Sequence, residues 1–99
     1  MKKVTIAALL ALLTFSAANA HTLFLSVYDN DDGTISVSGM YSTGSVAANT
    51  VVRLEGVDGK VLFEGKTDVD GELEIQKPTT PYTIVLDGGA GHVATEEGP

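Results

Sequence analysis

Apolar and polar residues alternate in short stretches over most of residues 21–99, and Gly, Asp and Asn separate these stretches. This pattern is typical of β-strands joined by tight turns, and none of it repeats with the period of a helix. A loop of small residues is expected over 42–49, and a connection rich in Pro and Thr over 77–81. Strands are predicted over 23–29, 34–41, 50–55, 60–65, 72–76 and 82–87, and a last one within 90–95.

The spacing of the turns predicts the fold class. Turn residues recur at intervals of roughly 8–12 residues, which favours a β-sandwich. We expect an all-β protein: a small Ig-like or transthyretin-like sandwich of about seven strands, with no second domain. Such a small core without disulfides is expected to be only marginally stable. The side chains predicted to face inward are Leu23, Leu25, Val27, Ile35, Val37, Val52, Leu54, Leu62, Leu73, Ile75, Ile84 and Leu86.

The first twenty residues follow a different pattern. Lys2 and Lys3 precede an almost wholly apolar stretch over 4–15, and small residues then lead to the sequence Ala18-Asn19-Ala20. A basic start, a short apolar stretch and an A-x-A close are typical of a secretory signal peptide. The apolar stretch is shorter than the ~20 residues that span a bilayer. We therefore expect a signal peptide at 1–20, cleavage after Ala20, and a periplasmic β-sandwich domain over 21–99.

Charge and cysteine content exclude several classes of function. The chain has 6 basic and 13 acidic residues and a formal net charge of −7. Both signal-peptide lysines would be lost on cleavage, which leaves four basic residues against 13 acidic ones, a formal charge of −9. An acidic domain of this kind is not expected to bind nucleic acid, because it cannot neutralise a row of phosphates. The absence of cysteine excludes disulfides, Cys-ligated zinc and a thiol nucleophile.

The two histidines, His21 and His92, are the candidate metal ligands. Cleavage after Ala20 would make His21 the N-terminal residue, which offers its α-amine and its ring nitrogen to one ion. The α-amine has a pKa near ~7.7–8.0 and gives up its proton to a metal more readily than a lysine does. Imidazole suits nickel, cobalt, copper and zinc. The alternative is that His21 merely follows the cleavage site and that His92 is a surface or packing residue.

Other chemistry has less support in the sequence. The acidic segment 29–33 resembles the start of a calcium loop, but its Gly is misplaced and Met40 stands where the final Glu would be. No Gly-x-Ser-x-Gly motif occurs, and the Gly-rich segment 88–91 is followed by neither a Lys nor a helix start. An oxidative enzyme built on an N-terminal histidine is a remote alternative, because no aromatic substrate face is evident. We therefore predict that the protein is not an enzyme.

Four segments together resemble a known family. They occur in the same order in the small periplasmic subunit of energy-coupling-factor nickel and cobalt transporters, a group akin to carboxypeptidase-regulatory-like and transthyretin-like domains. The Gly-Lys-Thr-Asp segment alone is common among such sandwiches, whereas the closing Asp-Gly-Gly-x-Gly-His segment is more specific. The segments are His21-Thr22-Leu23-Phe24, Gly39-Met40-Tyr41-Ser42-Thr43-Gly44, Gly65-Lys66-Thr67-Asp68-Val69-Asp70-Gly71-Glu72-Leu73 and Leu86-Asp87-Gly88-Gly89-Ala90-Gly91-His92.

The resemblance implies a function in metal uptake. A member of this family would bind or help deliver nickel or cobalt for a membrane transporter, with His21 and His92 as metal contacts and a transporter subunit as partner. Two alternatives remain open. One is a metal-free interaction module that docks onto a membrane partner, and the other is a copper-binding periplasmic protein.

Overall fold

The computed structural model describes residues 22–99, which form seven β-strands. The segment expected to be a signal peptide and the candidate ligand His21 lie outside the described residues. Residues 22–99 contain no helix that is long and apolar enough to cross a membrane. The strands are β1 (Leu23–Asp29), β2 (Thr34–Tyr41), β3 (Val51–Gly56), β4 (Val61–Lys66), β5 (Glu72–Gln76), β6 (Tyr82–Asp87) and β7 (Val93–Glu97).

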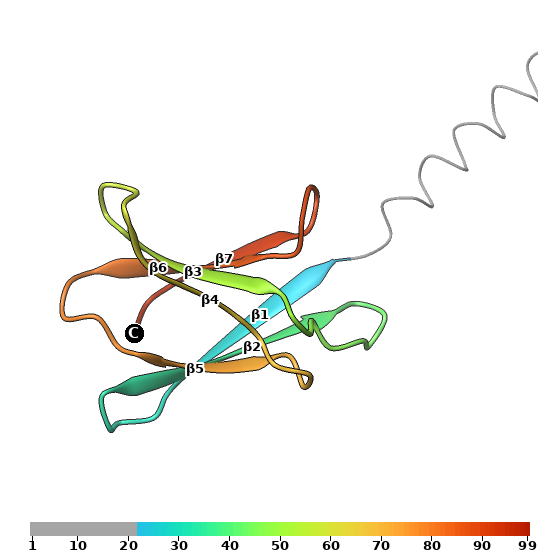
Figure 1. The fold of residues 1–99 in the computed structure, drawn as a ribbon, viewed down its shortest axis with the longest axis horizontal. Helices are drawn as coiled ribbons and strands as arrows, with labels where there is room; N and C mark the ends of the chain where they lie inside the picture. Colours follow the sequence, from blue (N-terminus) through green and yellow to red (C-terminus); the bar gives the residue numbers. More distant parts are fainter. Residues whose placement is uncertain (1–21) are drawn as a thin grey trace, which may run out of the picture.

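The strands form two antiparallel sheets. One sheet has three strands in the order β1-β2-β5, and the other has four in the order β4-β3-β6-β7. Figure 1 shows the sheets as two layers, with β2 and β5 on one side and β3, β6 and β7 on the other. β1 and β7 contact each other along one flank and link the layers there. The expectation of an all-β sandwich with seven strands is confirmed.

The core lies between the two layers and follows the predicted alternation. The side chains of Ile35, Val37, Val52, Leu54, Ile84 and Leu86 are fully buried. Predicted residues nearer the borders, Leu25, Val27 and Leu73, are partly buried and pack against this cluster. Ala47, Tyr82 and Val85 are buried as well, although the alternation did not mark them as inward.

Leu62 was expected to face inward, and this prediction is wrong. Leu54 pairs with Phe63, whereas Glu55 pairs with Val61, so Leu62 is the extra residue of a β-bulge in β4. A bulge shifts the alternation by one residue along the strand. Phe63 therefore takes the place opposite Leu54, and the Leu62 side chain remains 45% exposed.

The predicted bounds also change at three strands. β3 and β4 each begin and end one residue later than expected, and the last strand occupies 93–97 rather than 90–95. The last shift has a local cause, because residues 88–92 close a turn. The amide of His92 donates to the Gly89 carbonyl over 2.9 Å, and the amide of Gly88 donates to the His92 carbonyl over 2.7 Å.

Candidate functional site

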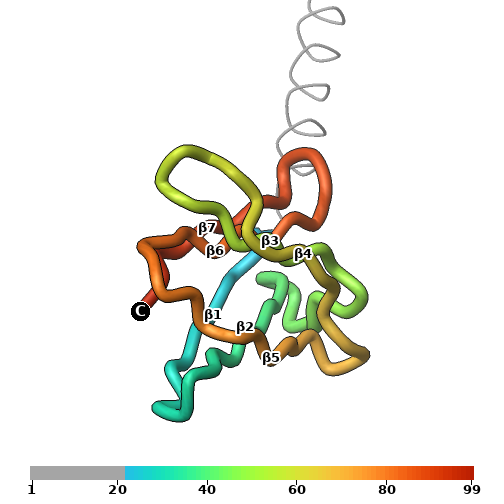
Figure 2. Tube along the Cα trace, turned by 60° about the vertical axis from the view of Figure 1, so that its left-hand side comes forward, coloured from blue at the N-terminus to red at the C-terminus, as the bar shows by residue number. Residues whose placement is uncertain are grey.

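One end of the sandwich collects the beginning of β1, the end of β2 and the β6–β7 turn (Figures 1 and 2). Leu23 at the start of β1 pairs with Tyr41 at the end of β2. The next pair of residues is joined by two hydrogen bonds. The Thr22 amide donates to Oγ of Ser42 over 3.0 Å, and the Ser42 amide donates to the Thr22 carbonyl over 2.8 Å. The backbone is therefore fixed as far as the first described residue.

His92 lies in the β6–β7 turn and contacts this end of the sandwich through Tyr41. The two rings meet edge to face, with centroids 5.8 Å apart and an angle of 84° between their planes. Gly88 makes room for this contact. A Cβ atom at Gly88 would lie 2.7 Å from the Tyr41 hydroxyl and 3.1 Å from the His92 carbonyl oxygen. The Gly-rich turn thus brings the His92 ring against Tyr41 of β2, the residue that pairs with Leu23 at the start of β1.

The imidazole of His92 has an unusual hydrogen-bonding state. Its Nδ1 atom is buried and has no hydrogen-bond partner within residues 22–99. Buried polar atoms in folded proteins almost always have a partner, because an unpaired one keeps the full cost of its desolvation. A ligand bound at this nitrogen would therefore replace no hydrogen bond made by residues 22–99.

The structure places only one of the two predicted ligands. His92 is described, whereas His21 is the residue just before the described part. Residues 22–99 contain no group of three or more His, Cys, Asp or Glu side chains that could hold a metal ion. Asp87, one residue before the turn, is already engaged. Its carboxylate accepts from Arg53 over 3.0 Å and from the Gly89 amide, and these bonds hold the pKa of Asp87 below its ordinary value.

The acidic β1–β2 turn uses its carboxylates to hold its own backbone. Asp29 accepts from the Asp31 amide over 3.0 Å, and Asp32 accepts from the amide of Thr34 over the same distance. Lys77 also donates to Asp29 over 2.8 Å. The bond from Lys77, and after it the bond from the Asp31 amide, lowers the pKa of Asp29. The Thr34 hydroxyl also donates to Asp32, and this bond, followed by the one from the Thr34 amide, lowers the pKa of Asp32. Turn formation accounts for the acidic residues that resembled a calcium loop.

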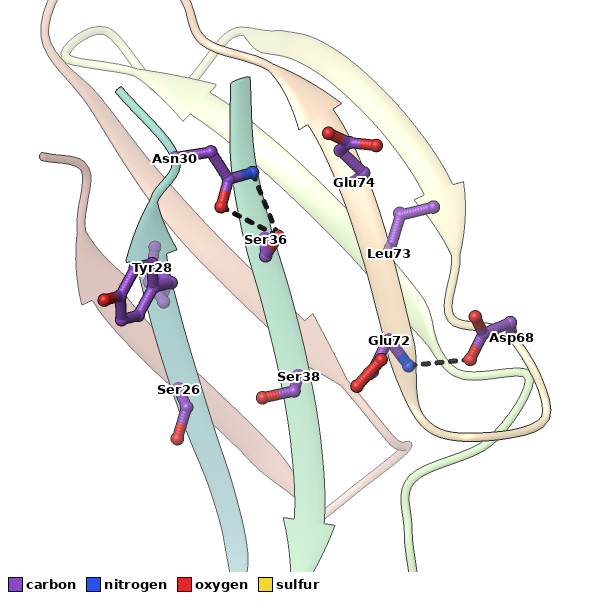
Figure 3. A pocket seen from close by; sticks show the side chains of 10 residues that line it. Ser26, Tyr28, Asn30, Ser36, Ser38, Asp68, Glu72, Leu73 and Glu74 are labelled. Carbon is purple, nitrogen blue, oxygen red and sulfur yellow. Dashed lines mark hydrogen bonds between the residues drawn. The ribbon is translucent and has the colours of Figure 1, made fainter. Parts of the chain in front are cut away.

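Sequence reasoning missed a hollow of about 550 Å³ on the outer face of the three-stranded sheet (Figure 3). Serines from β1 and β2 line its floor because Ser26 and Ser38 are cross-strand partners. Tyr28, 73% exposed, borders one side, and Glu72 and Glu74 of β5 border the other. These residues alternate with the predicted inward side chains of the same strands, so they face away from the core. Their alignment into one hollow depends on strand pairing, which the alternation alone does not specify.

No family model matches the chain, and no curated protein matches its sequence. The resemblance to the nickel and cobalt transporter subunit therefore remains an expectation from the sequence, and the functional argument depends on the geometry around His92.

Proposed function

We propose that this protein is exported, loses residues 1–20, and binds a divalent transition metal through His21 and His92. The α-amine and imidazole of His21 would supply two nitrogen ligands, and the imidazole of His92 a third. Nickel or cobalt, captured for uptake by a membrane transporter, is the cargo that the family resemblance suggests. The proposal classes the protein as a metal-binding accessory protein and not as an enzyme.

The observation that carries this proposal is the contact between His92 and the strand pair that begins at Thr22. His21 is covalently bonded to Thr22, and consecutive Cα atoms are ~3.8 Å apart. Hydrogen bonds fix Thr22 beside Ser42, and the preceding residue of β2, Tyr41, contacts the His92 ring. Two histidines separated by some seventy residues of sequence are thus expected at the same end of the sandwich.

The chemistry of the ligands supports a transition metal over calcium or magnesium. Amine and imidazole nitrogens suit nickel, cobalt, copper and zinc, whereas calcium and magnesium prefer oxygen. The unpaired Nδ1 of His92 fits this use, because a ligating histidine needs a nitrogen without another partner. The net negative charge of residues 21–99 would also attract cations to the domain. Copper remains an alternative cargo, since nitrogen sites generally bind it most tightly.

Isothermal titration of the exported protein with Ni²⁺, Co²⁺ and Cu²⁺ tests the proposal. Mass spectrometry first establishes that the purified chain begins at His21. We expect micromolar or tighter binding that weakens about tenfold or more in His92→Ala, with a larger loss in His21→Ala. An Ala inserted before His21 keeps both imidazoles and displaces the α-amine, so it isolates that ligand. Millimolar binding in the parent, or binding unchanged by all three variants, would refute the proposal.

A second candidate is a metal-free interaction module that docks onto a membrane partner. It is favoured by the exposed apolar side chains on the border strand β4, which pairs only with β3 within residues 22–99. Co-purification with a transporter subunit in the presence of a chelator would support this function. Co-purification only when metal is present would instead support the metal-binding function.

A further inference from the structure

Strand β4 is an exposed border of the four-stranded sheet. It pairs with β3 on one side, and no other strand of residues 22–99 joins its second side. At the opposite border of the same sheet, β7 packs against β1. The side chains of Val61, Leu62 and Phe63 are 49%, 45% and 37% exposed. Apolar residues on an unpaired border strand favour the addition of another strand.

The charges of β4 suit a second copy of the same strand. Glu64 and Lys66 flank Gly65 and form no ion pair within residues 22–99. They lie opposite Arg53 and Val51 of β3, on the outer face of the sheet. If two β4 strands pair antiparallel about a two-fold axis at Gly65, each Glu64 lies opposite Lys66 of the other copy. Opposite charges in directly facing positions stabilise an antiparallel pair.

Neighbouring registers lack this match. A two-fold axis at Glu64 would bring two carboxylates face to face, and an axis at Lys66 would do the same with two ammonium groups. Like charges in facing positions are destabilising. The bulge at Leu62 also limits regular pairing to the later half of β4.

The same register covers exposed apolar residues at both ends of the paired segment. Antiparallel pairing sets the end of one β4 strand beside the beginning of the other. The exposed Val61–Phe63 segment of each copy then lies beside the end of the other copy's β4. We propose that the protein forms a two-fold symmetric homodimer through β4, in which the two four-stranded sheets join into one.

This dimer is independent of the proposed metal site and is expected to be weak. One short strand pair buries less than a standard interface of ~1,200–2,000 Å², so we expect a Kd on the order of 100 μM. Sedimentation equilibrium measures it on protein purified from cells that express the full chain. EDTA is present throughout, so that an ion shared between two copies cannot account for association.

Charge exchange tests the register. Glu64→Lys and Lys66→Glu each turn two attractive pairs into two repulsive ones and should raise the Kd about tenfold or more. The double variant E64K/K66E restores opposite charges and should return the Kd to within about threefold of the parent. Lys60→Glu is the matched control for Lys66→Glu, since it makes the same charge change outside the paired segment and should leave the Kd nearly unchanged. Far-UV circular dichroism checks that each variant is folded.

Three results would overturn the proposal. The first is a parent protein that remains monomeric at about 2 mM, roughly twenty times the expected Kd. The second is a dimer that neither single variant weakens, or that the double variant fails to restore. The third is a dimer that forms only in a parallel measurement without EDTA, or that is lost in His92→Ala, since association would then depend on the metal site and not on β4.

Discussion

Truncation of two leucines that sequence alternation treats alike, Leu54 and Leu62, tests the arrangement of β3 and β4. Leu54→Ala removes three carbons from a side chain with no exposure. At ~0.8 kcal/mol per buried carbon this costs about 2.4 kcal/mol, and the cavity that remains raises the loss to about 3–4 kcal/mol. Leu62→Ala removes the same atoms from a side chain that is 45% exposed. Its open position leaves no closed cavity, so the expected loss is about 1 kcal/mol.

Urea denaturation followed by far-UV circular dichroism measures both losses, because the chain contains no tryptophan to report by fluorescence. In a domain of this size each kcal/mol lowers the melting temperature by roughly 4–8 °C, so the two variants are easily distinguished. The measurements use protein well below the concentration at which it associates. Equal losses in the two variants would refute the bulge and place Leu62 in the core. Substitution by lysine provides the complementary check. Leu62→Lys should fold, because its charge stays in solvent, whereas Leu54→Lys should not fold, because it would bury a charge.

Two further predictions concern a glycine turn and an ion pair. Gly71→Ala should cost about 2 kcal/mol or more, because its φ is +77° and a Cβ would lie 2.8 Å from the Gly39 carbonyl oxygen. Gly33→Ala, with a φ of +90° but open space, should cost about 1 kcal/mol by the same denaturation assay. The bond from Lys77 lowers the pKa of Asp29, so the unfolded chain binds a proton more readily than the folded one as the pH falls. The contribution of the Lys77–Asp29 pair to the free energy of unfolding is present above the ordinary carboxyl pKa and is lost in acid, below about pH 4–5. Lys77→Met should therefore flatten the dependence of this free energy on pH in that range and leave its shape near neutral pH unchanged.

Much of the fold could be predicted because one face of each strand is buried. The alternation at Ile35 and Val37, and again at Ile84 and Leu86, marks the inward side chains directly. The turn after β1 also sets the first hairpin, since Asp31 and Gly33 adopt positive φ, which few other residues tolerate. The alternation failed at Leu62 because a bulge adds one residue to β4 and leaves no mark in the order of apolar and polar residues.

The candidate site was predictable only as a list of ligands. Imidazole chemistry singles out His21 and His92, but nothing in the local sequence of either histidine specifies its distance from the other. The contact between His92 and Tyr41 depends on the turn at Gly88 and on the pairing of β1 with β2. The hollow beside Tyr28 has the same origin, because its serines come together only through strand register.

The sequence by itself determined the all-β class, most strand positions, most of the core and the identity of the candidate ligands. These properties depend on residue type and short-range spacing, which determine local backbone preference and the buried face. Tertiary structure alone decided that β2 also pairs with β5 and β3 with β6, that the turn holding His92 lies against Tyr41, and that β4 remains an open border within residues 22–99. Long-range pairing depends on packing over the whole domain, because each strand could satisfy its backbone hydrogen bonds with several neighbours and only burial of one common core selects among them.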